Sequence, residues 1–356
     1  MGAPRSFALD VLRQRVVFGR GSVQQVPKLV GDLGMSRVLV LASASATSAA
    51  DGLAATLGDV VVGRLHEARQ HVPEALAGEA TRLASDSDAD GAVTIGGGSA
   101  TGLGKAVAVA TGVRLVAVPT TYAGSEATPV YGITGTHKKT GRDERALPTA
   151  VVYDAELTTS MPAHVTATSG LNAMAHCVEA VYANGANPVT TLMAEEGVRL
   201  LARSLPAAVQ EPHDVAARED ALFGAYLAGW SMATAGSALH HTLCHVIGGS
   251  YDLGHGDVHS VLLPHVAAYN AAAATEPLGR LAGILDASDL ASGLLELAKT
   301  VGAPMSLVEL GMPPDGLGDV VDRTVEAIGG RNPRPVDPTS LGEMLQRAYD
   351  GAPPAP

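Results

Sequence analysis

The sequence has few cysteines and no long apolar run. Cys177 and Cys244 are the only two cysteines in 356 residues, and they lie in apolar surroundings without CxxC spacing. They predict no disulfide framework and fit a reducing compartment. No apolar run reaches the ~18 residues of a membrane span, and MGAPRSFALDVLRQ at the start lacks the apolar core of a signal peptide. We therefore expect a cytoplasmic protein that binds no membrane.

Positive charge is also scarce, since the formal net charge is −12 and only five lysines occur. Nucleic acids and anionic membranes need a clustered basic surface, so we expect neither as a partner. One dense basic cluster precedes residue 150, in THKKTGRDER, and it comprises Lys138, Lys139, Arg142 and Arg145. It is either a solvated hairpin or a contact to a cofactor or carboxylate, with Lys139 as the cofactor candidate.

The length allows about two domains of the usual ~150 residues. Up to about residue 155, short β-branched runs alternate with helix-like segments. These runs are RVVFG, SRVLVLAS, DVVVGRL, DGAVTIGGG, VRLVAVPTT and TAVVYD. Residues 38–41, 92–95 and 115–118 are nearly all apolar, as in strands that are covered on both faces. We therefore predict an α/β domain with a parallel sheet over residues 1–157.

After MPAHVTATSG, long Ala/Leu-rich stretches carry helical periodicity, with Gly and Pro at the breaks. These stretches are 171–183, 189–209, 215–239, 275–302, 316–328 and 339–350. They predict an all-helical second domain over residues 158–356. The Pro-rich end, GAPPAP, is expected to be disordered.

The first candidate site is a glycine-rich turn between a strand and a helix, in VTIGGGSATGLGKAVAVAT. Backbone amides at such a turn can approach a phosphate at the start of a helix, where the helix dipole also favours an anion. The residues concerned are Gly96, Gly97, Gly98 and Ser99. The stretch is not a P-loop and lacks GxGxxG spacing, so a turn that serves packing alone is the alternative.

The next strand ends in PTTYAGSE, with Thr120, Thr121 and Ser125. Strand ends in an open α/β sheet line the ligand crevice, so these hydroxyls are placed to bind a nucleotide. A Ser/Thr-rich turn without a ligand is the alternative.

Histidine gives the densest signal, because six of the twelve fall in LHHTLCHVIGGSYDLGHGDVHSVLLPH. They are His240, His241, His245, His255, His259 and His265. His241 and His245 share a helical face, and the glycine-rich turn before His255 could return the chain to them. Six histidines so close together are not all structural, so we assign at least two to a site. Asn172 and His176, four residues apart in SGLNAMAHCVEAVYA, also share a helical face.

In order and spacing, these motifs resemble maleylacetate reductases, a branch of the iron-containing alcohol dehydrogenase superfamily. The motifs are GGGSATGLGKA, PTTYAGSE, KKTGRD, GLNAMAHCVEAVYA, HH-x-LCHVIGG and RNPRPVD. The resemblance covers nearly the whole chain. It implies a dehydroquinate synthase-like fold, with a dinucleotide-binding α/β domain, a helical domain and the active site in the cleft between them. It also implies a homodimer and a role in aromatic compound catabolism.

In metal-dependent relatives an Asp and three His bind iron or zinc, and these positions fall on Asn172, His176, His241 and His255. Maleylacetate reductases likewise tend to have Asn at the first position and to work without metal, so the resemblance implies no metal here. Three histidines can still bind zinc, so the loss of the carboxylate alone does not exclude a metal. The branch usually reads HHKLCH where this chain has Thr242, which leaves the exact dicarboxylate substrate open.

The resemblance implies that NADH or NADPH delivers hydride to the activated C=C of maleylacetate or a related unsaturated oxo-acid, giving a 3-oxoadipate-type product. The protein must then orient the cofactor, stabilise an enolate and supply a proton. The catalytic candidates are His241, His245 and His255, and the substrate-binding candidates are Asn172, His176 and Tyr251. Two alternatives remain: a metal-dependent alcohol dehydrogenase, and a non-redox enzyme or ligand-binding protein on the same fold.

The choice between NADH and NADPH can be predicted from the end of the second strand. NAD-specific pockets usually place an Asp or Glu there, which binds the ribose 2′-OH and repels a 2′-phosphate. In VLASASATS no acid occurs from Val40 to Ala50. We therefore expect both cofactors to be accepted.

Overall fold

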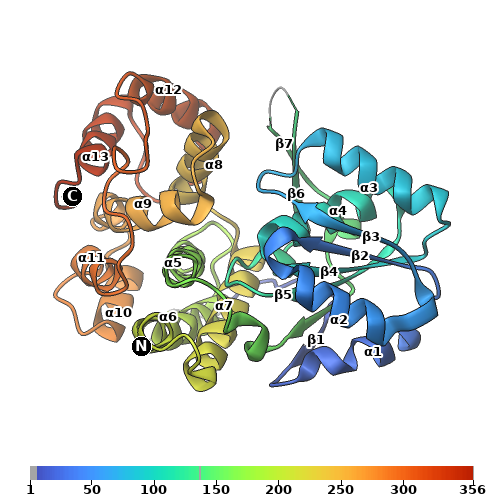
Figure 1. Cartoon of the computed structure of the whole chain (residues 1–356). Helices are drawn as coiled ribbons and strands as arrows, with labels where there is room; N and C mark the ends of the chain where they lie inside the picture. Colours follow the sequence, from blue (N-terminus) through green and yellow to red (C-terminus); the bar gives the residue numbers. More distant parts are fainter. Residues whose placement is uncertain (1–5, 136–137, 356) are drawn as a thin grey trace. The chain divides into compact units, whose positions relative to one another are not determined.

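The computed structural model describes residues 6–135 and 138–355 (Figure 1). The chain divides into two compact units. The α/β unit comprises Leu12–Met161 and His213–Leu222, and the helical unit comprises the described part of Met1–Val11, Pro162–Pro212 and Phe223–Pro356. The sequence placed one boundary after residue 157 and did not assign 213–222 to the first unit. That segment belongs there because buried Arg218 donates to the Tyr122 hydroxyl and the Met161 carbonyl.

All six predicted strands form, and they make one fully parallel sheet. In sheet order, the strands are β1 (Arg15–Phe18), β8 (Ala150–Tyr153), β5 (Arg114–Pro119), β4 (Gly91–Gly96), β2 (Val38–Ser43) and β3 (Val61–Ala68). The predicted α/β architecture of the first part of the chain is therefore confirmed.

Helices cover both faces of this sheet (Figure 1). Along β2, Val38, Val40 and Ala42 pack against α1 (Val26–Asp32) and α2 (Thr47–Leu57). The alternate residues Leu39 and Leu41 pack on the other face, against α3 (Glu74–Asp86) and α4 (Gly98–Thr111). Because both faces are buried, the strands read as continuous apolar runs.

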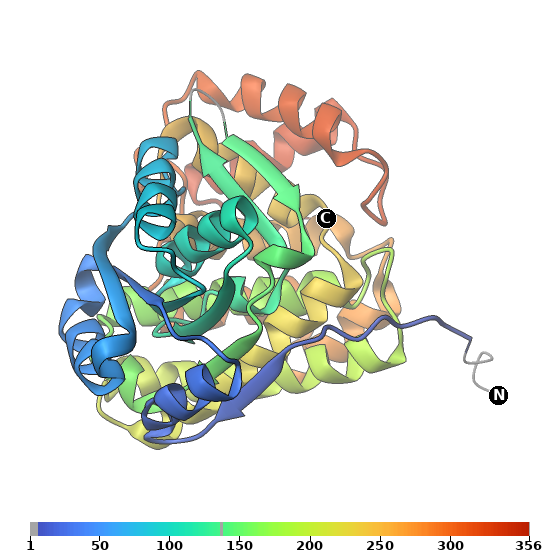
Figure 2. The same ribbon diagram turned by 90° about the vertical axis from the view of Figure 1, so that its right-hand side faces the viewer.

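The basic cluster lies partly on a hairpin of two antiparallel strands, β6 (Val130–Thr134) and β7 (Lys138–Arg142), drawn in green in Figure 2. Thr136 and His137 of THKKTGRDER lie outside the described residues. β6 packs against α3 and α4. Short 3-10 helices occur at Ser22–Gln25, Ala44–Ala46, Gly58–Val60, Ser125–Ala127, Glu144–Ala146 and Ala155–Thr158.

The helical unit confirms the predicted all-helical second part of the chain. Its helices are α5 (Ala163–Ala180), α6 (Pro188–Gln210), α7 (Val215–Ala235, which begins in the α/β unit), α8 (Leu239–Tyr251), α9 (His255–Asn270), α10 (Thr275–Ile284), α11 (Leu290–Thr300), α12 (Gly316–Ile328) and α13 (Pro338–Asp350). α9 packs against α5, α8, α11 and α13. Every residue from Val258 to Asn270 is buried, so this helix is the centre of the unit.

Three details of the helical prediction are wrong. The stretch 275–302 is two helices, because the chain turns at Leu285–Asp289, with Asp286 at φ 51°. α9 is absent from the predicted stretches, because a helix buried all round has no polar face to reveal its period. The chain end is not disordered as far as Ala355, since the Arg347 guanidinium donates to the Pro353 carbonyl at 2.7 and 2.9 Å. Among the described residues, no helix is long and apolar enough to cross a membrane.

Candidate active site

The glycine-rich turn connects β4 to α4 and is too crowded for side chains. Gly96 has φ +142°, and a Cβ there would lie 2.7 Å from Ser43 Oγ and 3.0 Å from Ala100 Cβ. A Cβ on Gly97 would lie 3.0 Å from Thr121 Cγ2. The turn is therefore enclosed by the carboxyl ends of β2 and β5, and Ser43 is a neighbour that the sequence did not single out.

The predicted cofactor residues fall into two groups. The first lies around this turn: Gly98 and Ser99 start α4, whose first amides have no partner within the helix, and the Thr120 amide donates to the Gly96 carbonyl at 3.0 Å. Ser125 starts the 3-10 helix a few residues further on. The second group is Lys139 alone, which is exposed on β7. No hydrogen bond or ion pair in the described structure joins Lys139 to the glycine-rich turn.

Six histidine rings from α5, α8 and α9 contact one another. His176 of α5 stacks on His241 of α8, with ring centroids 5.0 Å apart. The centroid of the His241 ring lies 4.9 Å from that of His259 and 6.4 Å from that of His245. His255 lies 4.4 Å from His259 and 5.9 Å from His245, so the turn before α9 returns His255 to α8 as expected. His240 lies 4.8 Å from His259 and completes the group.

Glu179 is the main residue that sequence reasoning missed. It is fully buried in α5, three residues after His176, and its carboxylate lies 2.6 Å from His241 Nδ1. It also accepts hydrogen bonds from the Ala238 and His240 amides at 2.9 and 2.7 Å. Its position in the Asn172–His176 motif was the available signal, because i, i+4 and i+7 share a helical face.

Burial lowers the pKa of three of these six rings. Burial and then the charge of His241 lower the pKa of His240 to about 3. Burial and then neighbouring imidazoles also hold the pKa values of His176 and His259 well below the ordinary value. Burial raises the pKa of Glu179, but the charge and hydrogen bond of His241 outweigh it, so the pKa of Glu179 lies below its ordinary value. The group therefore holds one ionised carboxylate beside three rings that burial keeps neutral, His176, His240 and His259.

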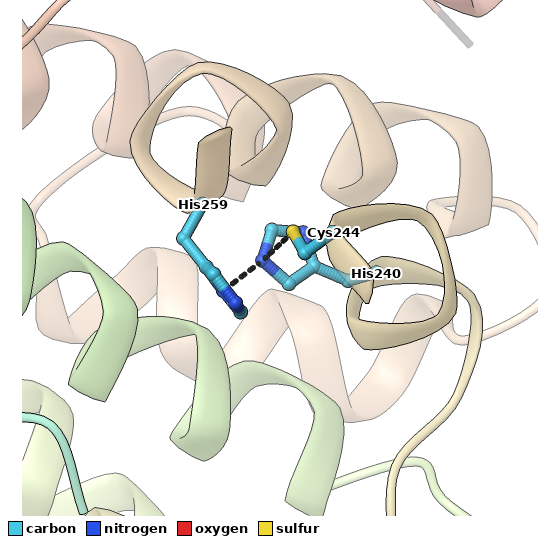
Figure 3. Close-up of side chains that lie close together, drawn as sticks. All are labelled: His240, Cys244 and His259. Atoms are coloured by element: carbon cyan, nitrogen blue, oxygen red, sulfur yellow. Dashed lines mark hydrogen bonds between the residues drawn. The ribbon is translucent and has the colours of Figure 1, made fainter. Parts of the chain in front are cut away.

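One trio in this group could offer metal ligands (Figure 3). Within residues 6–135 and 138–355, His240, Cys244 and His259 are the only His, Cys, Asp or Glu trio with donor atoms within 4.8 Å of one another. His240 Nε2 lies 2.9 Å from His259 Nδ1 and 3.6 Å from Cys244 Sγ. Burial and then the charge of Glu179 raise the pKa of the Cys244 thiol well above its ordinary value. The three side chains therefore form a buried group in which His240 contacts both partners, and their donor atoms also lie close enough together to hold a metal ion.

Of the four positions that the family resemblance implies for a metal, only the three histidines can be compared with this distance, since Asn172 is of another residue type. His176, His241 and His255 do not bring three donor atoms within 4.8 Å of one another in the described structure. His241 Nδ1 is already bound to Glu179, and Asn172 supplies a neutral amide from the buried face of α5. His176 Nδ1 and His241 Nε2 are nevertheless buried without a hydrogen-bond partner among the described residues. Unpartnered imidazole nitrogens of this kind can accept either a polar ligand group or a metal ion.

The remaining predicted residues have other surroundings. The Tyr251 hydroxyl donates to the Gly316 carbonyl at 3.2 Å, at the start of α12. Thr242 is buried and donates to the Ala238 carbonyl at 2.9 Å. His245 is exposed and His255 is half-buried, so these two rings form the solvent side of the histidine group. His265 lines a separate cavity of about 230 Å³ with Pro264, Lys299 and Pro353.

Comparison with known proteins gives a consistent result along the chain. Residues 13–155 match the family "Iron-containing alcohol dehydrogenase", and residues 166–349 match "Fe-containing alcohol dehydrogenase family, C-terminal". The chain is 44% identical to a maleylacetate reductase of Burkholderia cepacia and 47% identical to one of Sphingobium indicum, over 98% of this chain and 99% of each relative. The crystal structure of maleylacetate reductase from Agrobacterium tumefaciens matches with a TM-score of 0.93 and 43% identity, over 99% of this chain and all of that one.

Proposed function

Because the chain belongs to the maleylacetate reductase branch of the iron-containing alcohol dehydrogenase family, we propose that it reduces maleylacetate or a related unsaturated oxo-acid with NADH or NADPH. It is an oxidoreductase. The observation that carries the substrate proposal is the likeness to maleylacetate reductases over 98–99% of both chains.

The reaction moves two electrons and two hydrogens. When bound, NADH or NADPH would supply hydride to the alkene carbon β to the oxo group and be oxidised to the nicotinamide form, and the C=C electrons would move toward the oxo oxygen to give an enolate. A proton then adds to the α carbon, and a saturated 3-oxoadipate-type acid results. The cofactor supplies the hydride, and the chain must stabilise the enolate oxygen and supply the proton.

We assign these two tasks to His241, His245 and His255. The first ring is buried with a free Nε2, and the other two form the solvent side of the histidine group. A proton can therefore be given in a dry environment and replaced from water. His176 stacks on His241 from α5, and Asn172 lies one helical turn before it on the same helical face. We propose that this imidazole and this amide bind a substrate carboxylate or carbonyl. Tyr251 remains a proposed substrate contact.

For the cofactor, we propose that the amides of Gly96, Gly97, Gly98 and Ser99 hold its phosphates, with hydroxyls from Thr120, Thr121 and Ser125. The meeting of the β2, β4 and β5 ends at the start of a 14-residue helix supports this assignment. We also propose Lys139 as a cofactor contact. The family resemblance supports the proposal of a homodimer and a cytoplasmic location.

We further propose that the enzyme works without metal. The neutral amide of Asn172 in place of a carboxylate supports this. The hydrogen bond between His241 Nδ1 and Glu179 suits a metal-bound imidazole equally well and does not separate the two functions. The trio of His240, Cys244 and His259 supports the competing function, a metal-dependent alcohol dehydrogenase. Iron and zinc analysis of the purified protein, with turnover before and after chelation, separates the two. Stoichiometric metal with chelator-sensitive turnover would favour the dehydrogenase.

Oxidation of NADH and NADPH with a panel of substrates tests the function directly. We expect one cofactor oxidised per maleylacetate consumed, and slow or no reaction with simple aldehydes. Turnover of alcohols or aldehydes without reaction on unsaturated oxo-acids would refute the proposal. No cofactor oxidation with any of them would favour a non-redox role.

A further inference from the structure

We propose that Glu179 is a positioning residue that holds His241 by Nδ1 and so presents His241 Nε2 to the substrate. The assignment of His241 to substrate chemistry rests on the proposed function. The contact between the two side chains does not, because it is observed directly.

The Glu179 carboxylate has three close partners and no exposed surface. Its Oε2 atom lies 2.6 Å from His241 Nδ1 and accepts from the Ala238 amide at 2.9 Å. Its Oε1 atom accepts from the His240 amide at 2.7 Å. Two backbone amides therefore hold the carboxylate in the position where it contacts the imidazole.

This arrangement determines which nitrogen of His241 carries hydrogen. An ionised carboxylate only accepts hydrogen bonds, so Nδ1 must be the donor. His241 Nε2, at the opposite end of the ring from this contact, is buried and has no hydrogen-bond partner in the part of the chain that the structure describes. A neutral ring offers a lone pair there. A ring that carries the proton for the enolate offers N–H, with its positive charge balanced by Glu179.

One face of the His241 ring is also in contact with a second ring. His176 stacks on it at 5.0 Å with an angle of 23° between the ring planes. Since His176 and Glu179 are three residues apart on α5, one helix fixes both the plane of the ring and the direction of its Nδ1–Nε2 axis. Such support is what makes a catalytic imidazole reach a defined geometry.

Glu179 has a second effect that a test must separate from the first. α8 starts after Ala238, which provides no side-chain cap, and the carboxylate accepts from two amides at this helix start. Loss of Glu179 therefore weakens α8 as well as His241. Complete truncation to Ala would mix these effects, so conservative variants are needed.

The informative variant is Glu179→Gln. Glutamine has one oxygen and one amide nitrogen, so it cannot accept at both former carboxylate positions. Where its amide faces His241, the ring must accept at Nδ1 and carry hydrogen on Nε2. Glu179→Asp keeps the charge but withdraws it by one methylene. Asp289→Ala removes the cap of α11, where Asp289 accepts from the Ser292 amide at 2.9 Å, and serves as the matched capping control.

Four measurements are made on each full-length variant: kcat with maleylacetate, the Kd for NADH, the melting temperature, and imidazole nitrogen chemical shifts of His241. For Glu179→Gln we expect kcat to fall by about 10²–10⁴-fold, the Kd to stay within about threefold, and the nitrogen shifts to report a changed tautomer. Glu179→Asp should recover part of kcat. Asp289→Ala should lower the melting temperature by about 2–4 °C and leave kcat within about twofold.

Two results would overturn the proposal. One is a folded Glu179→Gln protein with wild-type kcat and an unchanged His241 tautomer. The other is a loss of kcat that follows melting temperature and NADH affinity in parallel, which would make Glu179 a structural cap only. If the wild-type protein does not reduce maleylacetate, the proposed function fails, while the nitrogen shifts measured without substrate still decide whether Glu179 sets the tautomer of His241.

Discussion

Replacing Gly96 with Ala tests the cofactor turn most sharply. Gly96 has φ +142°, a conformation that other residues adopt only at a cost of about 1–3 kcal/mol. The added methyl would also lie 3.0 Å from Ala100 Cβ and 3.3 Å from the Ser43 backbone nitrogen, neither of which can rotate away. Overpacking of this kind costs a further ~1–3 kcal/mol. The native turn is therefore disfavoured by about 2–6 kcal/mol in the variant.

The turn will relieve part of this cost by moving, and movement displaces the amides proposed to hold the phosphates. Every 1.4 kcal/mol lost from binding is about a tenfold rise in Kd. We expect Gly96→Ala to raise the Kd for NADH by about 10–100-fold and to lower the free energy of unfolding by about 2–4 kcal/mol. Fluorescence titration and denaturant unfolding measure the two quantities.

Gly52→Ala is the matched control in the same unit. It lies inside α2, and nothing lies within 4 Å of its added Cβ. Alanine should stabilise that helix by about 0.5–1 kcal/mol and leave the Kd for NADH unchanged. If Gly96→Ala bound NADH within threefold of wild type and unfolded like it, the turn would not hold the cofactor as proposed.

Four further predictions concern the cofactor, the histidines, the metal and pH. Since no acid occurs from Val40 to Ala50, kcat/KM for NADH and NADPH should differ by less than about 100-fold, or ~2.7 kcal/mol, and a larger preference would be contrary evidence. His241→Ala and His245→Ala should each lower kcat by ~10²–10⁴-fold with little change in cofactor Kd, and near-normal turnover in both would make the group structural. Asn172→Asp should raise zinc affinity in calorimetry and lower maleylacetate reduction, and unchanged zinc binding would contradict the inferred site. Burial and the charge of Arg347 lower the pKa of His265 to about 4, below the ~6.5 of the unfolded chain, so the folded state binds a proton less readily. The free energy of unfolding should therefore be about 2 kcal/mol lower at pH 5 than above pH ~6.5. His265→Leu should lose that part of the pH dependence of unfolding.

The strands were the most predictable part of the fold. Residues 38–41, 92–95 and 115–118 are nearly all apolar because helices cover both faces of the sheet, so successive side chains are buried on opposite faces. Short apolar runs of this kind between turns are typical of such strands. α9 was the least predictable helix. All residues from Val258 to Asn270 are buried, and the segment carries Pro264, so neither an apolar stripe nor composition indicated a helix.

The site was predictable as a set of residue types and not as a set of contacts. The histidine density and the i, i+4 pair of Asn172 and His176 indicated where the chemistry lies. The partner of His241 could not be predicted, because Glu179 is 62 residues away in sequence and only the packing of α5 and α8 brings them together. His259 was counted among the histidines but not singled out, since its central position depends on the same packing.

That separation in sequence has a consequence for folding. The Glu179–His241 contact closes a loop of 62 residues, and contacts of long sequence separation form late because loop closure must be completed first. α5 and α8 can each gain helical structure early, yet His241 stays unoriented until the two helices dock. On refolding from denaturant, reductase activity should therefore return after most of the circular dichroism signal, and its rate should report the docking of these helices.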